Sequence, residues 1–285
     1  MKIEKVHVVG GGAMGSGIAQ LCAQQGFQVT LSDLSLELAE KCRAGIARSL
    51  GGRVEKGKLT GEERDRILAN IKVAGDLSPA KQADLVIETV VEKLEVKKAV
   101  FAELDALLAK GVIILTNTTS LSITAMAEAT KRPDKVAQMH FFNPPVIMKL
   151  VEIMPGQKTS AETLRIAVEF AKALGKEPVL CRTEAPAGIV SRALGQLLNE
   201  ATWMVQSGVA EPADVDKSMK LGANHPMGPL ELIDLIGLDV HRAKMQTLRN
   251  ALDDPRYDHP AIIDQMIAEG RLGKKAGRGF YEYGK

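Results

Sequence analysis

The chain has 285 residues, enough for one large domain or two ordinary ones. Its apolar fraction of 45% is typical of a globular protein, and its net charge of +2 gives no electrostatic reason to expect nucleic-acid or membrane binding. No stretch approaches the ~18 consecutive apolar residues of a membrane span, and the first predicted strand begins near Ile3. We therefore expect neither a membrane helix nor a signal peptide.

The cysteines Cys22, Cys42 and Cys181 are scattered along the chain without the spacing of a metal site. We interpret them as reduced, mostly buried thiols, which indicates a cytoplasmic protein. The histidines and carboxylates form no cluster with ligand spacing either, so no metal is expected.

The first part of the chain alternates strand-like and helix-like segments. Apolar runs of strand length cover residues 5–9, 28–32, 71–74, 85–89, 112–116, 136–139, 150–153 and 178–181. Helical periodicity covers residues 14–24, 36–50, 60–70, 96–108, 123–129 and 161–174. The runs near Val6, Leu85 and Ile113 have the composition of strands buried on both faces of a parallel sheet. The pattern predicts an α/β protein in which residues 1–185 form a Rossmann-type, doubly wound domain.

Strand signals nearly vanish after Pro186, and residues 189–206, 212–220, 229–251 and 261–269 show helical periodicity. We expect residues 186–285 to form an all-α domain that contributes to a substrate cleft and to dimerisation. Its apolar residues are numerous for its size and include Met204, Val205, Leu221, Leu230, Leu232, Ile233, Leu235 and Ile236. Some of them are expected at the interface of a homodimer, although a self-contained helical core would explain the same composition.

A glycine motif follows the first predicted strand. Gly10 permits a tight turn, Gly12 lets the backbone approach a pyrophosphate, and Gly15 lets the next helix pack closely on the strand. That helix directs its free amides and positive dipole end at the phosphates. A purely structural strand-to-helix turn could use the same glycines. The strand and helix context favours dinucleotide binding, with contacts from Gly10, Gly12, Ala13, Met14 and Gly15.

Asp33 ends the second predicted strand, where a carboxylate can accept hydrogen bonds from both hydroxyls of an adenosine ribose. A 2′-phosphate would be repelled there, and the neighbouring residues Ser32, Leu34 and Ser35 include no base. The predicted cofactor is therefore NAD rather than NADP.

His140 is the best candidate among the five histidines for the proton acceptor that a nicotinamide enzyme needs. It follows an apolar strand, and ligands bind at the carboxyl ends of strands in open α/β sheets. The chain then turns back, and a hairpin of that length can bring Glu152 beside His140. A carboxylate there fixes the imidazole tautomer and stabilises the imidazolium. Taken singly, His140 could be a structural residue and Glu152 a solvated edge carboxylate.

Several longer segments resemble those of one enzyme family. They are residues 8–19 (VVGGGAMGSGIA), 91–93 (VEK), 117–124 (NTTSLSIT), 139–144 (MHFFNP), 148–152 (MKLVE), 219–229 (MKLGANHPMGP) and 275–281 (KAGRGFY). Together they identify the chain as a member of the 3-hydroxyacyl-CoA dehydrogenase family, similar to the short bacterial 3-hydroxybutyryl-CoA dehydrogenases.

The resemblance implies that His140 is the catalytic base and Glu152 its partner. It implies NAD contacts from Glu92, Lys97, Thr119, Asn143 and Lys275, and coenzyme A contacts from Ser49 and Lys56. Without the family, Lys97 and Lys275 would be interpreted as solvated charges. Arg53, Lys56 and Lys58 fall among glycines at 51, 52 and 57, which predicts a short basic loop suited to phosphates, although charged loops are usually just solvated.

Two positions depart from the family pattern. Thr119 stands where the family has a catalytic serine, so a hydroxyl remains but an added methyl narrows the site. Ser191 stands where the family has a substrate-binding asparagine, and a hydroxyl is shorter than an amide. Both residues are expected to hold the substrate oxygen.

The sequence therefore predicts an NAD-dependent (S)-3-hydroxyacyl-CoA dehydrogenase that takes a short-chain acyl-CoA substrate. One alternative is a related hydroxyacid or sugar-acid dehydrogenase that does not use coenzyme A. The other is a non-catalytic NAD-binding structural protein, which the presence of both His140 and Glu152 disfavours.

Overall fold

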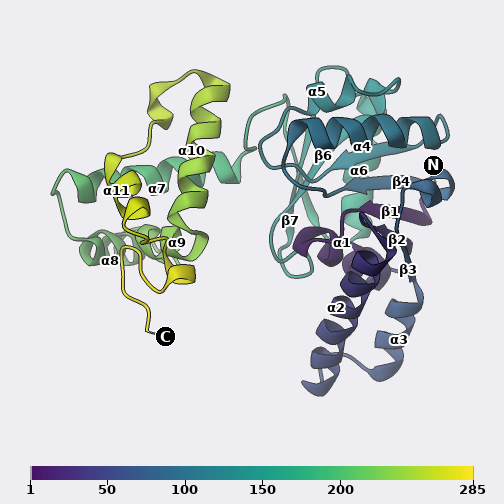
Figure 1. Ribbon diagram of the computed structural model, residues 1–285, viewed down its shortest axis with the longest axis horizontal. Helices are drawn as coiled ribbons and strands as arrows, with labels where there is room; N and C mark the ends of the chain where they lie inside the picture. The colour runs from purple at the N-terminus through teal and green to yellow at the C-terminus, as the bar shows by residue number, and fades with distance from the viewer. Residues whose placement is uncertain (1, 285) are drawn as a thin grey trace. The chain divides into compact units, whose positions relative to one another are not determined.

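The computed structural model describes residues 2–284, and the chain divides into two compact units, Met1–Ala185 and Pro186–Lys285. The first unit is built on one eight-stranded sheet with the order β3-β2-β1-β4-β5-β6-β7-β8 (Figure 1). Its strands are β1 (Lys5–Val9), β2 (Gln28–Ser32), β3 (Ile71–Ala74), β4 (Leu85–Glu88), β5 (Ile113–Thr116), β6 (Val136–Phe141), β7 (Leu150–Pro155) and β8 (Glu177–Leu180).

Helices cover both faces of this sheet. They are α1 (Ala13–Gln24), α2 (Leu36–Glu55), α3 (Gly61–Ala69), α4 (Leu94–Leu107), α5 (Ile123–Ala127) and α6 (Ala161–Ala173), with the 3-10 helices η1 (Ser78–Gln82) and η2 (Pro133–Lys135). Strand β4 shows why both faces need cover. Leu85 and Ile87 belong to the core under α1, α2 and α6, whereas Val86 belongs to the core under α4 and α5. The predicted doubly wound fold is confirmed.

Strands β1 to β6 run parallel, and β7 reverses direction to pair antiparallel with β6. The pairing extends β6 to Phe141, so His140 lies inside the strand rather than just beyond its end. The register places His140 directly opposite Glu152.

The second unit is helical. Its helices are α7 (Val190–Gln206), α8 (Pro212–Gly222), α9 (Pro229–Ile236), α10 (Leu238–Leu252) and α11 (Ala261–Ala268), with the 3-10 helices η3 (Pro255–Tyr257) and η4 (Lys274–Ala276). The single helix expected over residues 229–251 is wrong, because Gly237 adopts a φ of 104° and separates α9 from α10. Such a backbone conformation cannot continue an α-helix and strongly favours glycine.

Candidate active site

The glycine turn after β1 has the geometry that its sequence predicted. Gly10 has a φ of 94°, and its amide donates to the Ser32 carbonyl over 2.8 Å. A Cβ at Gly15 would lie 1.8 Å from the Gly10 carbonyl oxygen, so only glycine lets α1 approach the turn this closely. At Gly12, by contrast, a Cβ would meet nothing within 4 Å. The space beside Gly12 is open, as it must be if a ligand is to touch this backbone.

The first turn of α1 leaves its amides accessible. Gly12 is the N-cap, no side chain caps the helix, and no acidic residue lies in the first turn. Gly12 and Ala13 are exposed and Met14 is half-buried. Unoccupied first-turn amides and the positive dipole end suit a phosphate group.

Asp33 lies beside this turn. Its Oδ2 accepts from the Gly11 amide over 2.8 Å and its Oδ1 from the Leu34 amide over 2.7 Å. Each carboxylate oxygen has two lone pairs, so Asp33 can still accept from ribose hydroxyls. The glycine turn and Asp33 are thus held together by a direct hydrogen bond.

A pocket of about 550 Å³ opens at Asp33. Sequence reasoning missed its apolar wall, which includes Leu34 with 92% exposure and Val91 with 61% exposure. Such exposed apolar side chains suit the faces of an adenine ring. The lining also includes Asp76 and Glu103 but no lysine or arginine among the described residues, so a 2′-phosphate would meet only negative charge.

The His140 and Glu152 side chains form a buried pair. Nδ1 of His140 lies 3.2 Å from Oε2 of Glu152, and the residues are 6% and 1% exposed. Because an ionised carboxylate only accepts hydrogen bonds, Nδ1 donates and Nε2 is the basic nitrogen. Directly opposed residues of an antiparallel pair project from the same face, which explains the contact. The predicted contact between His140 and Glu152 is present.

Thr119 lies on the other side of the imidazole. Its Oγ1 is 3.5 Å from His140 Nε2, and the ring of Phe142 lies 4.6 Å from the imidazole ring between centroids. A substrate oxygen placed between the Thr119 hydroxyl and Nε2 could bond to both. Substituting threonine for serine therefore keeps the hydroxyl where the chemistry needs it.

Glu92 holds the segment that carries Thr119. Its Oε1 accepts from Thr118 Oγ1 over 2.6 Å, from the Thr119 amide over 2.9 Å and from the Ser120 amide over 3.1 Å. Burial acts to raise the pKa of Glu92, but the Thr118 hydrogen bond, the Lys97 charge and the two amides outweigh it and lower the pKa. Glu92 is therefore ionised at neutral pH and fixes the loop beside His140.

Lys97 is buried, with 1% exposure, so its interpretation as a solvated helix charge is wrong. Its Nζ lies 2.6 Å from Glu88 Oε1, 3.2 Å from the Val90 carbonyl oxygen and 3.5 Å from Glu92 Oε2. Sequence reasoning missed Glu88, which is fully buried and also accepts from Thr116 Oγ1 over 2.7 Å. These Lys97 contacts hold residues 88–92 in place. This segment lines the pocket at Asp33 with Val90 and Val91 and carries Glu92, which bonds the Thr119 amide. A direct contact of Lys97 with the cofactor stays a prediction.

The remaining predicted residues of the first unit are exposed. Asn143 follows β6, and Ser49 lies on α2. The basic loop expected from residue 51 onward is wrong in its extent, because α2 continues through Gly51 and Gly52 to Glu55 and Lys56 caps it. Ser49 and Lys56 are thus on one helix and about two turns apart, which places them on the same face.

Two predicted residues belong to the second unit. Ser191 lies in the first turn of α7, half-buried. Lys275 lies in η4 and its Nζ bonds Asp239 Oδ1 and Oδ2 over 2.5 and 2.7 Å, so it is a paired surface charge in this structure.

Together, the fold and the site define a dinucleotide-dependent oxidoreductase with a buried histidine–carboxylate pair. Comparison with known proteins gives the family. The description "3-hydroxyacyl-CoA dehydrogenase, NAD binding domain" matches residues 5–185, and "3-hydroxyacyl-CoA dehydrogenase, C-terminal domain" matches residues 189–283.

Individual relatives agree with the family match. A probable 3-hydroxybutyryl-CoA dehydrogenase of Deinococcus radiodurans is 43% identical over 98% of this chain and 100% of its own length. The 3-hydroxybutyryl-CoA dehydrogenase of Clostridioides difficile is 43% identical over 99% of this chain and 100% of its own. The crystal structure of (S)-3-hydroxybutyryl-CoA dehydrogenase from Ralstonia eutropha is 40% identical and superposes with a TM-score of 0.96, covering 100% of both chains.

The chain belongs to the 3-hydroxyacyl-CoA dehydrogenase family. Its first unit is the NAD-binding domain of that family, which confirms NAD as the cofactor. Among residues 2–284, no group of histidine, cysteine and carboxylate side chains could hold a metal ion, and no helix is long and apolar enough to cross a membrane.

Proposed function

We propose that this protein is an NAD-dependent (S)-3-hydroxyacyl-CoA dehydrogenase that interconverts 3-hydroxybutyryl-CoA and acetoacetyl-CoA. The names of the relatives support this substrate, and one structural observation carries the reaction class. It is the buried His140–Glu152 pair, whose Nδ1 and Oε2 atoms lie 3.2 Å apart in an NAD-binding unit.

In the oxidation direction, His140 Nε2 accepts the proton of the C3 hydroxyl as the C3–O bond becomes a carbonyl. When bound, NAD⁺ supplies the acceptor for the hydride that leaves C3. Glu152 keeps the proton on Nδ1 and stabilises the imidazolium that results. The Thr119 hydroxyl hydrogen-bonds the substrate oxygen beside Nε2, together with Ser191 from the second unit. In the reduction direction the same imidazolium returns its proton to the oxygen.

The cofactor site in this proposal combines the glycine turn with residues further along the chain. The backbone of Gly10, Gly12, Ala13, Met14 and Gly15 would hold the pyrophosphate, and Asp33 would hold the adenosine ribose. The open space beside Gly12 and the acidic, apolar pocket at Asp33 support this assignment. The nicotinamide half would be held by Glu92, Lys97, Thr119, Asn143 and Lys275.

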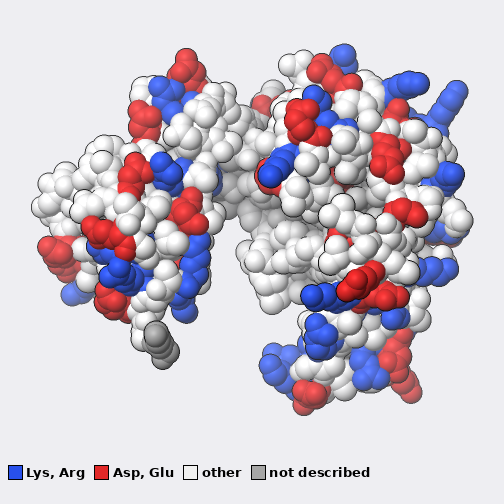
Figure 2. All heavy atoms as spheres, viewed as in Figure 1, with Lys and Arg blue, Asp and Glu red and all other residues white. Residues whose placement is uncertain are grey.

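Coenzyme A would be recognised at the end of α2 by Ser49 and Lys56. Both are exposed and project from the same face of that helix. Basic and acidic side chains lie close together at this end of the unit (Figure 2). The local attraction for phosphate is therefore a matter of individual lysines rather than of a broad positive surface.

We further propose that the protein works as a cytoplasmic homodimer joined through its second unit. Trp203 and Met204 on α7, Val209 after it, Leu221 on α8 and Leu235 on α9 are all at least 37% exposed in the isolated chain, which is unusual for so many large apolar side chains in one small unit. Light scattering at micromolar concentration should give about twice the chain mass, and a monomer would contradict the proposal.

The decisive assay follows NADH oxidation with acetoacetyl-CoA or free acetoacetate as substrate, and NAD⁺ reduction with a sugar acid. Acetoacetyl-CoA should be strongly preferred. His140→Ala should lower kcat by about 100-fold or more, and Glu152→Gln should also be severe. The double variant should be little worse than His140→Ala, because residues that act as a unit are not additive.

The matched control is Glu177→Gln, which makes the same chemical change at an exposed position of β8. It should leave kcat unchanged, and all variants should still bind NADH. Near-normal turnover without His140 would place the base elsewhere, and preference for a substrate without coenzyme A would move the protein to another branch of the family.

A further inference from the structure

One face of the sheet is polar across three neighbouring strands. Strand β1 presents Lys5 and His7, β2 presents Gln28 and Thr30, and β3 presents Lys72. Lys5 is in register with Gln28, His7 with Thr30, and Thr30 with Lys72. Strand β1 is a central strand of the sheet, where side chains are normally apolar on both faces, so exposure to solvent does not explain the buried polar side chain of His7.

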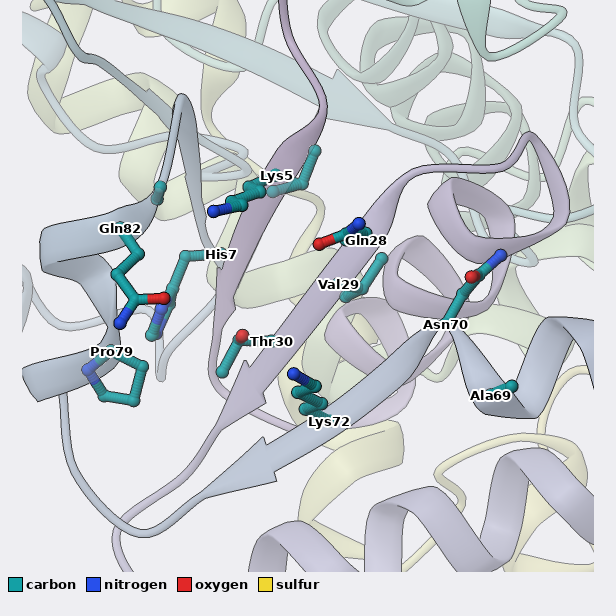
Figure 3. Close-up of a pocket in the computed structure, with 12 residues that line it drawn as sticks. Lys5, His7, Gln28, Val29, Thr30, Ala69, Asn70, Lys72, Pro79 and Gln82 are labelled. Carbon is teal, nitrogen blue, oxygen red and sulfur yellow. The ribbon is translucent and has the colours of Figure 1, made fainter.

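The stripe lines a pocket of about 400 Å³ (Figure 3). The connection between β3 and β4 contains only the 3-10 helix η1, which covers less of the sheet than a full crossover helix would. Pro79 and Gln82 of η1 form one wall, and the strands form the floor. This pocket is separate from the one at Asp33, since no residue lines both.

Two lysines give the pocket its positive charge. Lys5 and Lys72 form no ion pair with any described residue, and no carboxylate is among the residues that line the pocket. The acids Asp84 and Asp76 lie near the pocket, but they bond backbone amides rather than the lysine ammonium groups. Asp84 accepts from the Glu4 and Lys5 amides over 2.9 and 2.8 Å, and Asp76 accepts from the Ser78 amide over 2.8 Å. Two strand spacings and an offset of two residues along the strands separate the Cα atoms of the two lysines by about 12 Å, a distance that two extended lysine side chains can bridge around one small ligand.

His7 adds a buried polar group at the pocket floor. It is 1% exposed, its Nε2 lies 2.8 Å from Ser32 Oγ, and its Nδ1 has no hydrogen-bond partner among the described residues. Burial lowers the pKa of His7 to about 4, so the ring is neutral at physiological pH. A buried polar atom without a partner is rare in native proteins and points to a group that completes the site.

We propose that this pocket is a further ligand site, which binds a compact dianion of the phosphate class. Lys5 and Lys72 supply the charge, while Gln28, Thr30 and Gln82 supply neutral hydrogen-bonding groups around it. A face that is only solvated would also be polar, but it would not need to leave a buried imidazole nitrogen unpaired.

The test uses the full-length protein saturated with NADH, so that the glycine turn is occupied. Inorganic phosphate is titrated by calorimetry at constant ionic strength into the wild type, K5Q/K72Q and the matched control K81Q. Lys81 is exposed on η1 but does not line the pocket. Wild type and K81Q should bind phosphate alike, and K5Q/K72Q should bind at least tenfold more weakly. Phosphate binding that survives in K5Q/K72Q would overturn the proposal.

Two further measurements sharpen the result. The imidazole signals of His7 in a ¹H–¹⁵N spectrum should shift along the same saturation curve in the wild type, and binding without this shift would overturn the placement. Succinate, a dianion without a tetrahedral phosphate, should bind more weakly, and equal affinity would overturn the assignment to the phosphate class. Because K5Q/K72Q alters two exposed side chains, its thermal unfolding should match that of the wild type.

Discussion

The buried Lys97–Glu88 pair gives the sharpest prediction about how this site is held together. Both side chains are at most 1% exposed, and the Nζ to Oε1 distance is 2.6 Å. Lys97→Met keeps the length and apolar volume of the stem but removes the charge. It leaves the Glu88 carboxylate buried with only the Thr116 hydroxyl and the Val90 amide as donors.

Removing one partner of a buried ion pair costs about 3–5 kcal/mol, because the remaining charge is uncompensated. Typical domains are stable by only about 5–15 kcal/mol, so the first unit of Lys97→Met should unfold at much lower urea concentration. Lys97→Met/Glu88→Gln should recover part of the loss, since neither buried side chain is then charged. The KM for NADH should also rise, because Val90 and Val91 line the pocket at Asp33.

Urea unfolding followed by circular dichroism measures the loss. The only tryptophan, Trp203, lies on α7, so its fluorescence follows the second unit and serves as an internal reference. The matched control is Lys98→Met on the same helix, which removes a surface lysine 3.5 Å from Glu95 and should cost less than about 0.5 kcal/mol. A loss below about 1 kcal/mol in Lys97→Met, or an equal loss in the control, would refute the reasoning.

Three further outcomes follow from the same structure. Gly12→Ala should leave the thermal unfolding midpoint unchanged and weaken NADH binding. Gly15→Ala, whose Cβ would lie 1.8 Å from a carbonyl oxygen, should destabilise the fold by about 1–3 kcal/mol or more. Calorimetry measures the unfolding of both variants, and NADH titration measures their cofactor binding. Asp33→Ala should weaken NADH binding by about 1–3 kcal/mol in fluorescence titrations, and tighter binding of NADPH than of NADH by the wild type would contradict the role of Asp33. His241 is fully buried, neither ring nitrogen bonds another residue among positions 2–284, and burial lowers its pKa from 6.5 to about 3. In the unfolded chain the imidazole of His241 binds a proton at higher pH than in the folded chain, so the free energy of unfolding falls as the pH drops from 6.5 towards 3. His241→Leu should unfold at a higher urea concentration and lose less stability over that pH window. A variant less stable than the wild type at pH 7 would refute this.

The sequence predicted the parts of the site that depend on short segments. Gly10 and Asp33 directly follow strand ends, Gly15 lies in the first turn of the next helix, and the hairpin that returns after β6 can bring Glu152 beside His140. These features are local, so periodicity and turn chemistry suffice to find them.

Other features depend on tertiary contacts that the sequence does not display. Gly51 and Gly52 look like a loop, yet α2 continues through them, because packing can override a glycine cost of about 1 kcal/mol per residue. Gly237 interrupts an otherwise continuous helical pattern. A glycine in such a pattern can be tolerated inside a helix or can end it, and the φ of 104° shows that Gly237 ends α9. Lys97 looks like a surface charge because it lies in a charged helical stretch and its partner Glu88 is nine residues away on a strand.

The direct opposition of His140 and Glu152 also bears on how such an enzyme can diversify. The backbone ladder between β6 and β7 sets the distance between the two side chains, and it does so independently of residues 142–149 that join the strands. That connecting segment can therefore change its sequence or length during evolution while His140 and Glu152 stay in register. Variation in the loop is thus uncoupled from the geometry of the pair, which the backbone ladder preserves through insertions and deletions.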